Sequence, residues 1–240
     1  MSPPAAESLS EARLRFADLA EETTGFGEIE FRTFRDLLIR PRDVLIAYLQ
    51  RGVTGGGLYA RPFGFYLALC GVLMFYMFLM GGLKGIIEQQ PAEQINQWVA
   101  ASGKSREMFI DDADGWMGLV AVPLMSLFYA GFGAPLIRWW SGLDWRRSMR
   151  ATLALLCAWT VPILFLGPLP MIKGFELIGS LFMYAALIAA FLRMGRGIWF
   201  ERWWAGLGKA MLFLIVVMIG AWLSMMPVFR IGLLGALYGN

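Results

Sequence analysis

Five long apolar runs constrain the fold of this chain more than any other feature of its sequence. Each run is close to the roughly 20 residues that a helix needs to cross a hydrocarbon core of about 30 Å. A membrane-spanning segment must satisfy its own backbone, and no alternating pattern favours a barrel, so each run is expected to be a helix. The sequence therefore predicts an all-α integral membrane protein with five transmembrane helices, at residues 62–83, 116–137, 151–169, 175–192 and 207–229.

The composition of the chain supports a bilayer as its solvent. Of its 240 residues, 58% are hydrophobic and 16% are charged. Ordinary globular domains have about 45–50% apolar and about 25% charged residues. No charged residue falls in the middle of an apolar run, and charges at that depth mark proton and ion pathways. The pattern argues against a proton-coupled pump, an ion channel with a charged filter and a redox carrier.

The residue types that carry most metal and acid–base chemistry are scarce. The chain has no histidine, which is the commonest metal and haem ligand and the commonest general base. Its two cysteines, Cys70 and Cys157, lie inside apolar runs and are expected to be small buried hydrophobic residues. Ser126, Ser180 and Ser224 lack a His or carboxylate partner at membrane depth, which argues against a nucleophilic enzyme. We therefore expect no catalytic site, no metal site and no cofactor.

The lysines and arginines are distributed unevenly between the two sides of the predicted bilayer. Sixteen of the 21 lie in the segment before the first span and in or beside the connections after the second and fourth spans. Cytoplasmic loops carry an excess of Lys and Arg, so the N-terminus is predicted inside and the C-terminus outside. Residues 1–30 lack the apolar core of a signal peptide and are expected to form a cytoplasmic extension. A lead-in at residues 31–61 and a membrane domain at 62–240 follow it.

The lead-in before the first span is basic and amphipathic. Apolar residues share one helical face on each side of Pro41, and proline suits the first turn of a helix, which predicts two short helices meeting at Arg40–Pro41. Such helices lie in the headgroup layer or pack against the protein's own cytoplasmic loops, and the two arrangements are compatible. We assign contact with lipid headgroups or with a partner to five arginines, Arg40, Arg42, Arg51, Arg146 and Arg147.

One sizeable segment, residues 84–115, is expected outside the membrane on the side opposite the N-terminus. Its partial apolar faces predict one or two short helices. Asp111, Asp112 and Asp114 cluster near its end, but their spacing differs from that of an EF-hand loop and no bidentate Glu follows. Asp114 is instead expected to cap the second transmembrane helix.

The chain contains two similar hexamers, RWWSGL at residues 138–143 and RWWAGL at 202–207. Trp and Arg are enriched at membrane interfaces, so interface anchors are expected at Trp139, Trp140, Trp203 and Trp204. A second echo, Ala158–Trp159 against Ala221–Trp222, has nearly the same offset. The likeness indicates a parallel repeat of two hairpins, spans two and three against spans four and five, with coincidence as the alternative.

The lead-in and the first span resemble bacterial multi-pass families grouped with the Yip-like (Ypt-interacting-protein-like) domain. The residues that carry this resemblance are Leu37, Leu38, Arg40, Pro41, Tyr48, Leu49, Tyr59 and Pro62. The resemblance extends over residues 31–230 and implies five spans with the N-terminus inside and a place in the bacterial inner membrane. Some relatives carry a cysteine-rich zinc ribbon that this chain lacks, so it implies nothing about zinc, and it brings no catalytic residues.

Two functions from different classes remain open at this point. The first is a non-enzymatic accessory, scaffold or membrane-organising protein, with the lipid bilayer and a protein partner or a second copy as its partners. The alternative is a carrier or scramblase for a lipid-like or apolar substrate. A nucleic-acid partner is not expected, because no basic tract with interleaved aromatic residues is present.

Overall fold

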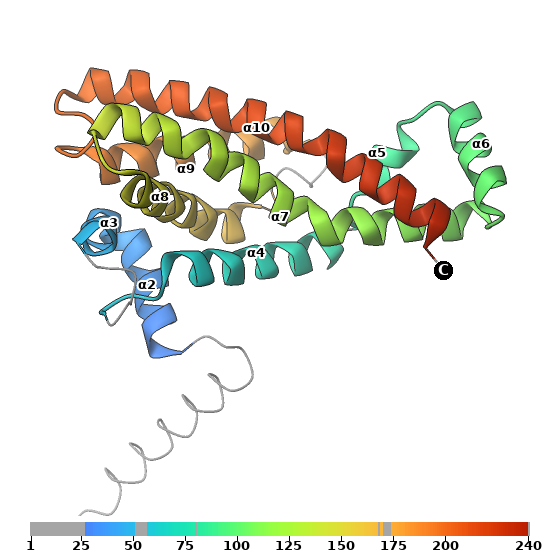
Figure 1. Cartoon of the computed structure of the whole chain (residues 1–240), viewed down its shortest axis with the longest axis horizontal. Helices are drawn as coiled ribbons and strands as arrows, with labels where there is room; N and C mark the ends of the chain where they lie inside the picture. Colours follow the sequence, from blue (N-terminus) through green and yellow to red (C-terminus); the bar gives the residue numbers. More distant parts are fainter. Residues whose placement is uncertain (1–26, 51–56, 80, 168, 170–173, 240) are drawn as a thin grey trace, which may run out of the picture.

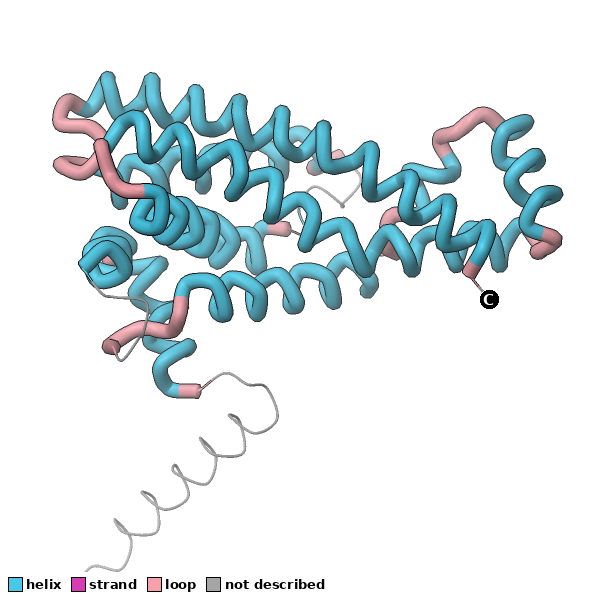
Figure 2. Tube along the Cα trace, in the orientation of Figure 1, coloured by secondary structure: helices cyan, strands magenta, loops and turns pink. Residues whose placement is uncertain are grey.

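The computed structural model describes residues 27–50, 57–79, 81–167, 169 and 174–239 of the chain. Over these residues the protein is all-helical, and its helices are joined by short loops (Figures 1 and 2). The helices are α2 (Glu28–Ile39), α3 (Pro41–Gln50), α4 (Pro62–Leu79), α5 (Lys84–Glu88), α6 (Ala92–Ser102), α7 (Arg106–Ser141), α8 (Trp145–Leu166), α9 (Glu176–Gly195) and α10 (Trp203–Tyr238). Five of them, α4, α7, α8, α9 and α10, are long and apolar enough to cross a membrane, which confirms the predicted all-α, five-span architecture.

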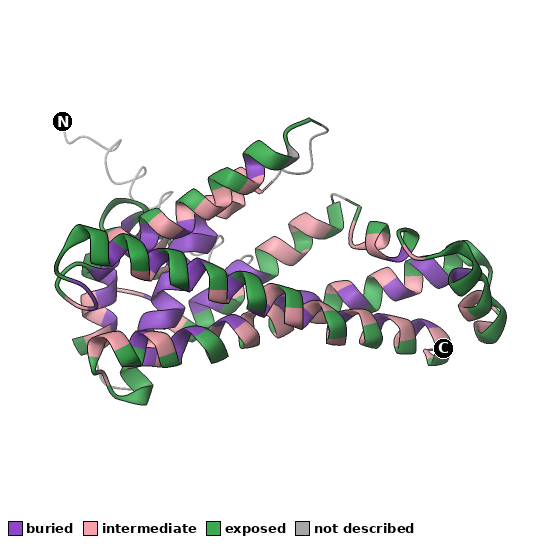
Figure 3. Ribbon diagram, turned by 90° about the horizontal axis from the view of Figure 1, so that it is seen from above, coloured by how far each residue is buried: buried purple, intermediate pink, exposed green. Residues whose placement is uncertain are grey.

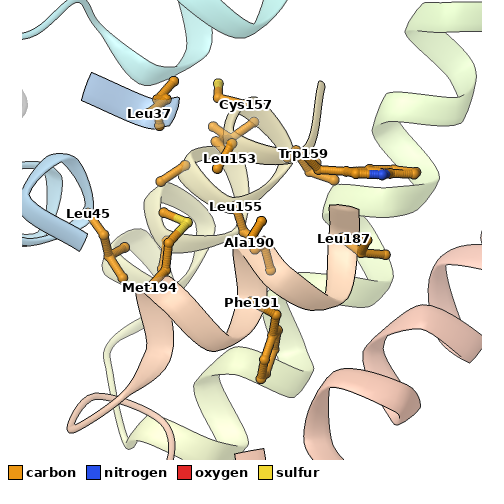
Figure 4. Packing of buried hydrophobic residues seen from close by; sticks show 14 of the residues in the cluster. Leu37, Leu45, Leu153, Leu155, Cys157, Trp159, Leu187, Ala190, Phe191 and Met194 are labelled. Carbon is orange, nitrogen blue, oxygen red and sulfur yellow. The ribbon is translucent and has the colours of Figure 1, made fainter. Parts of the chain in front are cut away.

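Helix α8 forms the centre of the bundle. Every residue from 151 to 161 on it is buried, because α4, α7, α9 and the two N-terminal helices pack around it. A helix that is apolar on all its faces is usually buried, as this one is. Figure 4 shows Leu37 of α2, Leu45 of α3 and Met194 of α9 among the side chains gathered around it.

Helices α7 and α10 form a long antiparallel pair that runs the length of the molecule (Figure 1). Each has 36 residues, which at a rise of about 1.5 Å per residue gives about 54 Å, well beyond a hydrocarbon core of about 30 Å. Their close packing rests on a buried stripe of α10 that recurs every four residues, Gly220, Ser224, Val228, Gly232 and Ala236. Small residues in such a stripe let two helix backbones approach closely.

The protruding ends of α7 and α10 carry α5 and α6, at the end of the molecule that holds the C-terminus (Figure 1). A small second core forms there around Ile87, Phe109, Met117 and Val228. The two short helices confirm the prediction for this segment. Figure 3 shows that buried residues are denser at the opposite end of the molecule.

The predicted cap of the second span is wrong. Helix α7 begins at Arg106, and Ser105 caps it by accepting the N–H of Met108 at 3.2 Å. Asp114 lies two turns inside the helix and accepts the backbone N–H of Leu83. The polar stretch before the apolar run stays helical because its apolar face, which includes Phe109, is buried in the second core.

Candidate functional site

The two helices at the N-terminal end are tied to the rest of the bundle by polar side chains. As predicted, α2 and α3 meet at Arg40–Pro41, and both pack on α8. The buried hydroxyl of Thr33 accepts the N–H of Ala60 at 2.8 Å. The hydroxyl of Tyr59 donates to Asp36 Oδ2 at 3.1 Å. These bonds fasten the chain that enters α4 to the face of α2.

Asp36 is ionised in this arrangement although it is only 7% exposed. Burial alone would raise the pKa of its carboxyl. Hydrogen bonds from Arg35 and Tyr59, together with the positive charges of Arg35 and Arg40, outweigh that effect and hold the pKa of Asp36 below its ordinary value. The charged form of Asp36 is therefore the form that joins α2 to the entry of α4.

Arg193 of α9 closes the last turn of α2. Its two terminal nitrogens donate to the carbonyl oxygens of Leu38 and Ile39, each at 2.8 Å. The last carbonyls of a helix have no partner within the helix, and a guanidinium can satisfy two of them at once. The contact spans more than 150 positions of the sequence and fixes α2 relative to the C-terminal half of the bundle.

Four of the five arginines assigned to headgroup or partner contact lie exposed at this end of the molecule. They are Arg40 and Arg42 at the junction of α2 and α3, and Arg146 and Arg147 at the start of α8. Arg147 also forms an exposed pair with Asp144, 3.3 Å between Nε and Oδ2. The fifth, Arg51, lies outside the described residues. We call these four exposed arginines, which share one end of the molecule, the basic surface.

The tandem tryptophans are not equivalent. Trp139 is 75% exposed, whereas Trp140 turns inward and meets the ring of Phe191 edge-on at 5.8 Å between centroids. Trp203 and Trp204 are both exposed, with their ring centroids 4.8 Å apart. Three of the four predicted anchors thus face outward, and Trp140 belongs to the core.

An aromatic cluster that includes Trp140 also holds a lysine. Lys209 Nζ donates to the carbonyl oxygen of Trp199 at 2.5 Å and lies 5.6 Å from the ring centroid of Trp140. Phe191 contacts the rings of Trp199 and Phe213 in the same cluster. A cation over an indole face is stabilised by the ring quadrupole. The second tryptophan of RWWSGL therefore has a structural partner that its sequence motif does not reveal.

Two shallow hollows flank the RWW hexamers at this end. One is lined by Arg138, Trp139, Asp144 and Trp145 among others, and the second by Arg196, Arg202, Trp203 and Trp204 among others. Guanidinium groups bind phosphate in a bidentate manner, and indoles favour the headgroup layer. Both hollows therefore suit the phosphate of a lipid headgroup.

A third hollow, of about 660 Å³, lies at the opposite end, where α4 stops beside α7. Its walls are apolar and its mouth carries the Lys84–Asp111 ion pair, 2.6 Å between Nζ and Oδ1, and Asp114. Sequence reasoning missed this hollow. A weak signal was present, because the same three charged residues border the first and second apolar runs.

Deeper along the same seam, α4 and α7 share a small polar network. Tyr66 donates its hydroxyl to Ser126 Oγ at 3.0 Å, and Ser126 donates to the carbonyl of Val122 at 2.6 Å. Cys70 Sγ lies 3.6 Å from the same hydroxyl. On α10, Ser224 donates to the carbonyl of Ala221 at 2.7 Å. These contacts join helices and satisfy hydroxyls, as is usual for Ser in membrane helices.

In the part of the chain that the structure describes, no group of three or more His, Cys, Asp or Glu residues could hold a metal ion. Comparison of the chain with known protein families, with curated proteins and with solved structures finds no match.

Proposed function

We propose that the protein is a non-enzymatic, multi-pass protein of the bacterial inner membrane that acts as an accessory or membrane-organising subunit for a protein partner. The observation that carries this proposal is the fixed basic surface at the α2–α3 end. Arg193 and Asp36 tie α2 to α9 and to the entry of α4, so the basic surface stands on a rigid base. A pre-organised surface loses little conformational freedom when a partner binds.

In this proposal the α2–α3 end faces the cytoplasm, with the N-terminus inside and the C-terminus in the periplasm. The ends of α7 and α9 and the starts of α8 and α10 all lie at that end (Figure 1). Each of these four positions carries arginines, and cytoplasmic loops are rich in Arg and Lys. The resemblance of the lead-in to Yip-like families supports the same orientation. The outward tryptophans would then lie at the inner headgroup layer as anchors.

The hairpin repeat is part of the proposal. Both hairpins, α7–α8 and α9–α10, turn at the α2–α3 end and carry an RWW hexamer there. The helix lengths run 36, 22, 20 and 36 residues, so the long helix comes first in one hairpin and last in the other. A parallel duplication therefore requires a later lengthening of α7 and of α10 at the far end.

The non-enzymatic part of the proposal has two supports. The sequence has no histidine to act as a base. Ser126 and Ser224 donate their hydroxyls to carbonyls of their own helices and not to a base. A serine without a base is a weak nucleophile.

The test compares two charge variants of the full-length protein in mild detergent. In the first, Arg40, Arg42, Arg146 and Arg147 are changed to Gln. In the control, two arginines that lie towards the opposite end, Arg106 and Arg230, are changed to Gln. We expect the wild type and the control to retain a stoichiometric partner, and the first variant to lose it. Added salt should weaken the binding of this partner, because charges on a surface act over about 8–10 Å and are screened by salt.

Two outcomes would overturn the proposal. A wild-type protein that purifies alone, or a partner retained by both variants, would mean that the basic surface has only the ordinary role of cytoplasmic charge in topology. Reconstitution into vesicles with labelled lipid addresses the alternative. We expect flip rates at background, and a clear increase would favour a carrier or scramblase.

A further inference from the structure

The hollow lies beside the end of α4, the shortest of the five helices that are apolar enough to cross a membrane. Helix α4 has 18 residues, which is about 27 Å of helix and barely enough to cross the hydrocarbon core. Its last turns contribute Met74, Phe75, Met77 and Phe78 to the wall of the hollow. Helix α7 continues past this point as the opposite wall. The hollow thus begins beside the last apolar turns of α4 and extends to the polar residues that follow them.

Glycines create the depth of the hollow on the α7 side. Gly115 and Gly118 line it, and a Cβ added at either position would have no atom within 4 Å. Phe75 and Phe78 on the facing wall are mostly exposed within the chain. A volume of about 660 Å³ falls in the range of about 300–1,000 Å³ that is usual for small-molecule sites. The space accepts an apolar chain that lies along α4 and α7.

The mouth of the hollow carries charges of both signs. Lys84 pairs with Asp111, and the hydrogen bond and charge of Asp111 raise the pKa of Lys84 above its ordinary value. Asp114 accepts the N–H of Leu83 through Oδ1, and its Oδ2 faces Gly82. Gly82 has a φ of 69°, and a Cβ there would collide with this carboxylate. Two carboxylates and one ammonium group give the mouth a net charge of −1.

We propose that this hollow is a binding site for one zwitterionic phospholipid whose headgroup carries a primary ammonium group. One acyl chain would lie between the apolar walls. The ammonium would face Asp111 and Asp114, and the phosphate would lie within reach of Lys84. The charge pattern selects this headgroup, because a purely anionic headgroup would meet two carboxylates, and a quaternary ammonium could not donate hydrogen bonds to them. The proposal does not rest on the scaffold role of the basic surface, which lies at the opposite end.

The test measures lipid retention by native mass spectrometry of the full-length protein. The protein is incubated with equal amounts of phosphatidylethanolamine, phosphatidylglycerol and phosphatidylcholine that share the same acyl chains. We expect one equivalent of phosphatidylethanolamine to be retained, with a preference of about tenfold over each of the others. Gly118→Phe should reduce this adduct by about tenfold, because the new ring fills the space for the acyl chain.

The controls separate a filled hollow from a damaged fold. Gly131→Phe adds the same ring to the same helix at an exposed position with open space around it, and it should leave the adduct unchanged. The double change Asp111→Asn and Asp114→Asn keeps an acceptor for Leu83 and should remove the preference for the ammonium headgroup. Melting temperatures of all variants confirm that they are folded.

Three results would overturn the proposal. Equal retention of the three lipids by the wild type would remove the headgroup assignment. An unchanged adduct in folded Gly118→Phe would place the lipid elsewhere, and an unchanged preference in the double Asn variant would mean that the carboxylates do not select it.

Discussion

The two ends of this molecule use the same apolar composition to different effect. At the α2–α3 end, seven helices contribute to one large core, and a guanidinium and buried hydrogen bonds join elements that are distant in sequence. At the opposite end, α7 and α10 continue as a pair with only two short helices against them. The difference follows from helix length, because α4 stops after 18 residues where α7 continues. The α2–α3 end is therefore closely packed, and the opposite end leaves a hollow.

A related contrast separates α8 from α4. In the most apolar 18-residue stretch of α8, 61% of the residues are buried inside the protein, whereas in the corresponding stretch of α4 only 22% are. The two helices have nearly equal hydropathy, because lipid tails and a protein interior are equally apolar. Hydropathy therefore predicts that a helix crosses the membrane but not which of its faces meets lipid.

The largest expected effect is at the tightly packed end. A Cβ on Gly195 would lie 1.6 Å from Nε1 of Trp199, which is 1% exposed inside the aromatic cluster. Gly195→Ala must therefore displace a buried indole, and losing a buried aromatic side chain costs about 3–5 kcal/mol. We expect the melting temperature in detergent to fall by about 10 °C, at roughly 2–4 °C per kcal/mol for a protein of this size.

Gly208→Ala is the matched control for this change. Its added Cβ meets open space, and alanine favours a helix over glycine by about 1 kcal/mol. An equal fall in both variants would mean that the aromatic cluster is not the tightly packed part of the molecule.

The second effect is intermediate and belongs to the opposite end. Lys104 Nζ donates to the carbonyls of Ala236 and Gly239, at 2.9 and 2.7 Å, and pairs with Asp112 at 2.7 Å. Lys104→Met leaves the last carbonyls of α10 without this donor, which costs about 1–3 kcal/mol locally. We expect faster hydrogen exchange over residues 228–239, with the α2–α3 end unchanged.

Lys84→Met provides the comparison for Lys104→Met. Its pair with Asp111 has a similar length, 2.6 Å, but both side chains are largely exposed, and exposed pairs contribute little to stability because water and salt screen them. If Lys84→Met accelerates hydrogen exchange in α10 as much as Lys104→Met does, the hydrogen bonds from Lys104 to the end of α10 are not what stabilises this end.

Sequence reasoning reached the number of spans and the junction at Pro41, because apolar run length and proline position act locally. It missed features that depend on long-range contacts. Nothing near Asp114 in sequence shows that Leu83 would be its partner, or that α7 would begin nine residues before the predicted start. Trp140 packs against Phe191 of the other hairpin, and Lys209 lies over the Trp140 ring from that hairpin too. The hollow arises because α4 and α7 differ in length. The two apolar runs in the sequence show less of this difference than the helices do.

The smallest expected effect concerns pH at the α2–α3 end. Burial would raise the pKa of Asp36, but hydrogen bonds from Arg35 and Tyr59 lower it below the ordinary value of 3.8. A carboxyl whose pKa is lower in the folded state stabilises that state fully above its ordinary pKa and loses this contribution as the pH falls through the folded pKa. Hydrogen exchange of α2 should therefore accelerate as the pH falls below 3.8, after correction for intrinsic rates.

Asp36→Asn should show faster exchange at neutral pH and little further change in acid. Asp43→Asn, on the exposed face of α3, should keep the response of the wild type. A response that persists in Asp36→Asn would assign the acid sensitivity to other carboxyls and leave the α2–α3 end held mainly by Arg193 and by apolar packing.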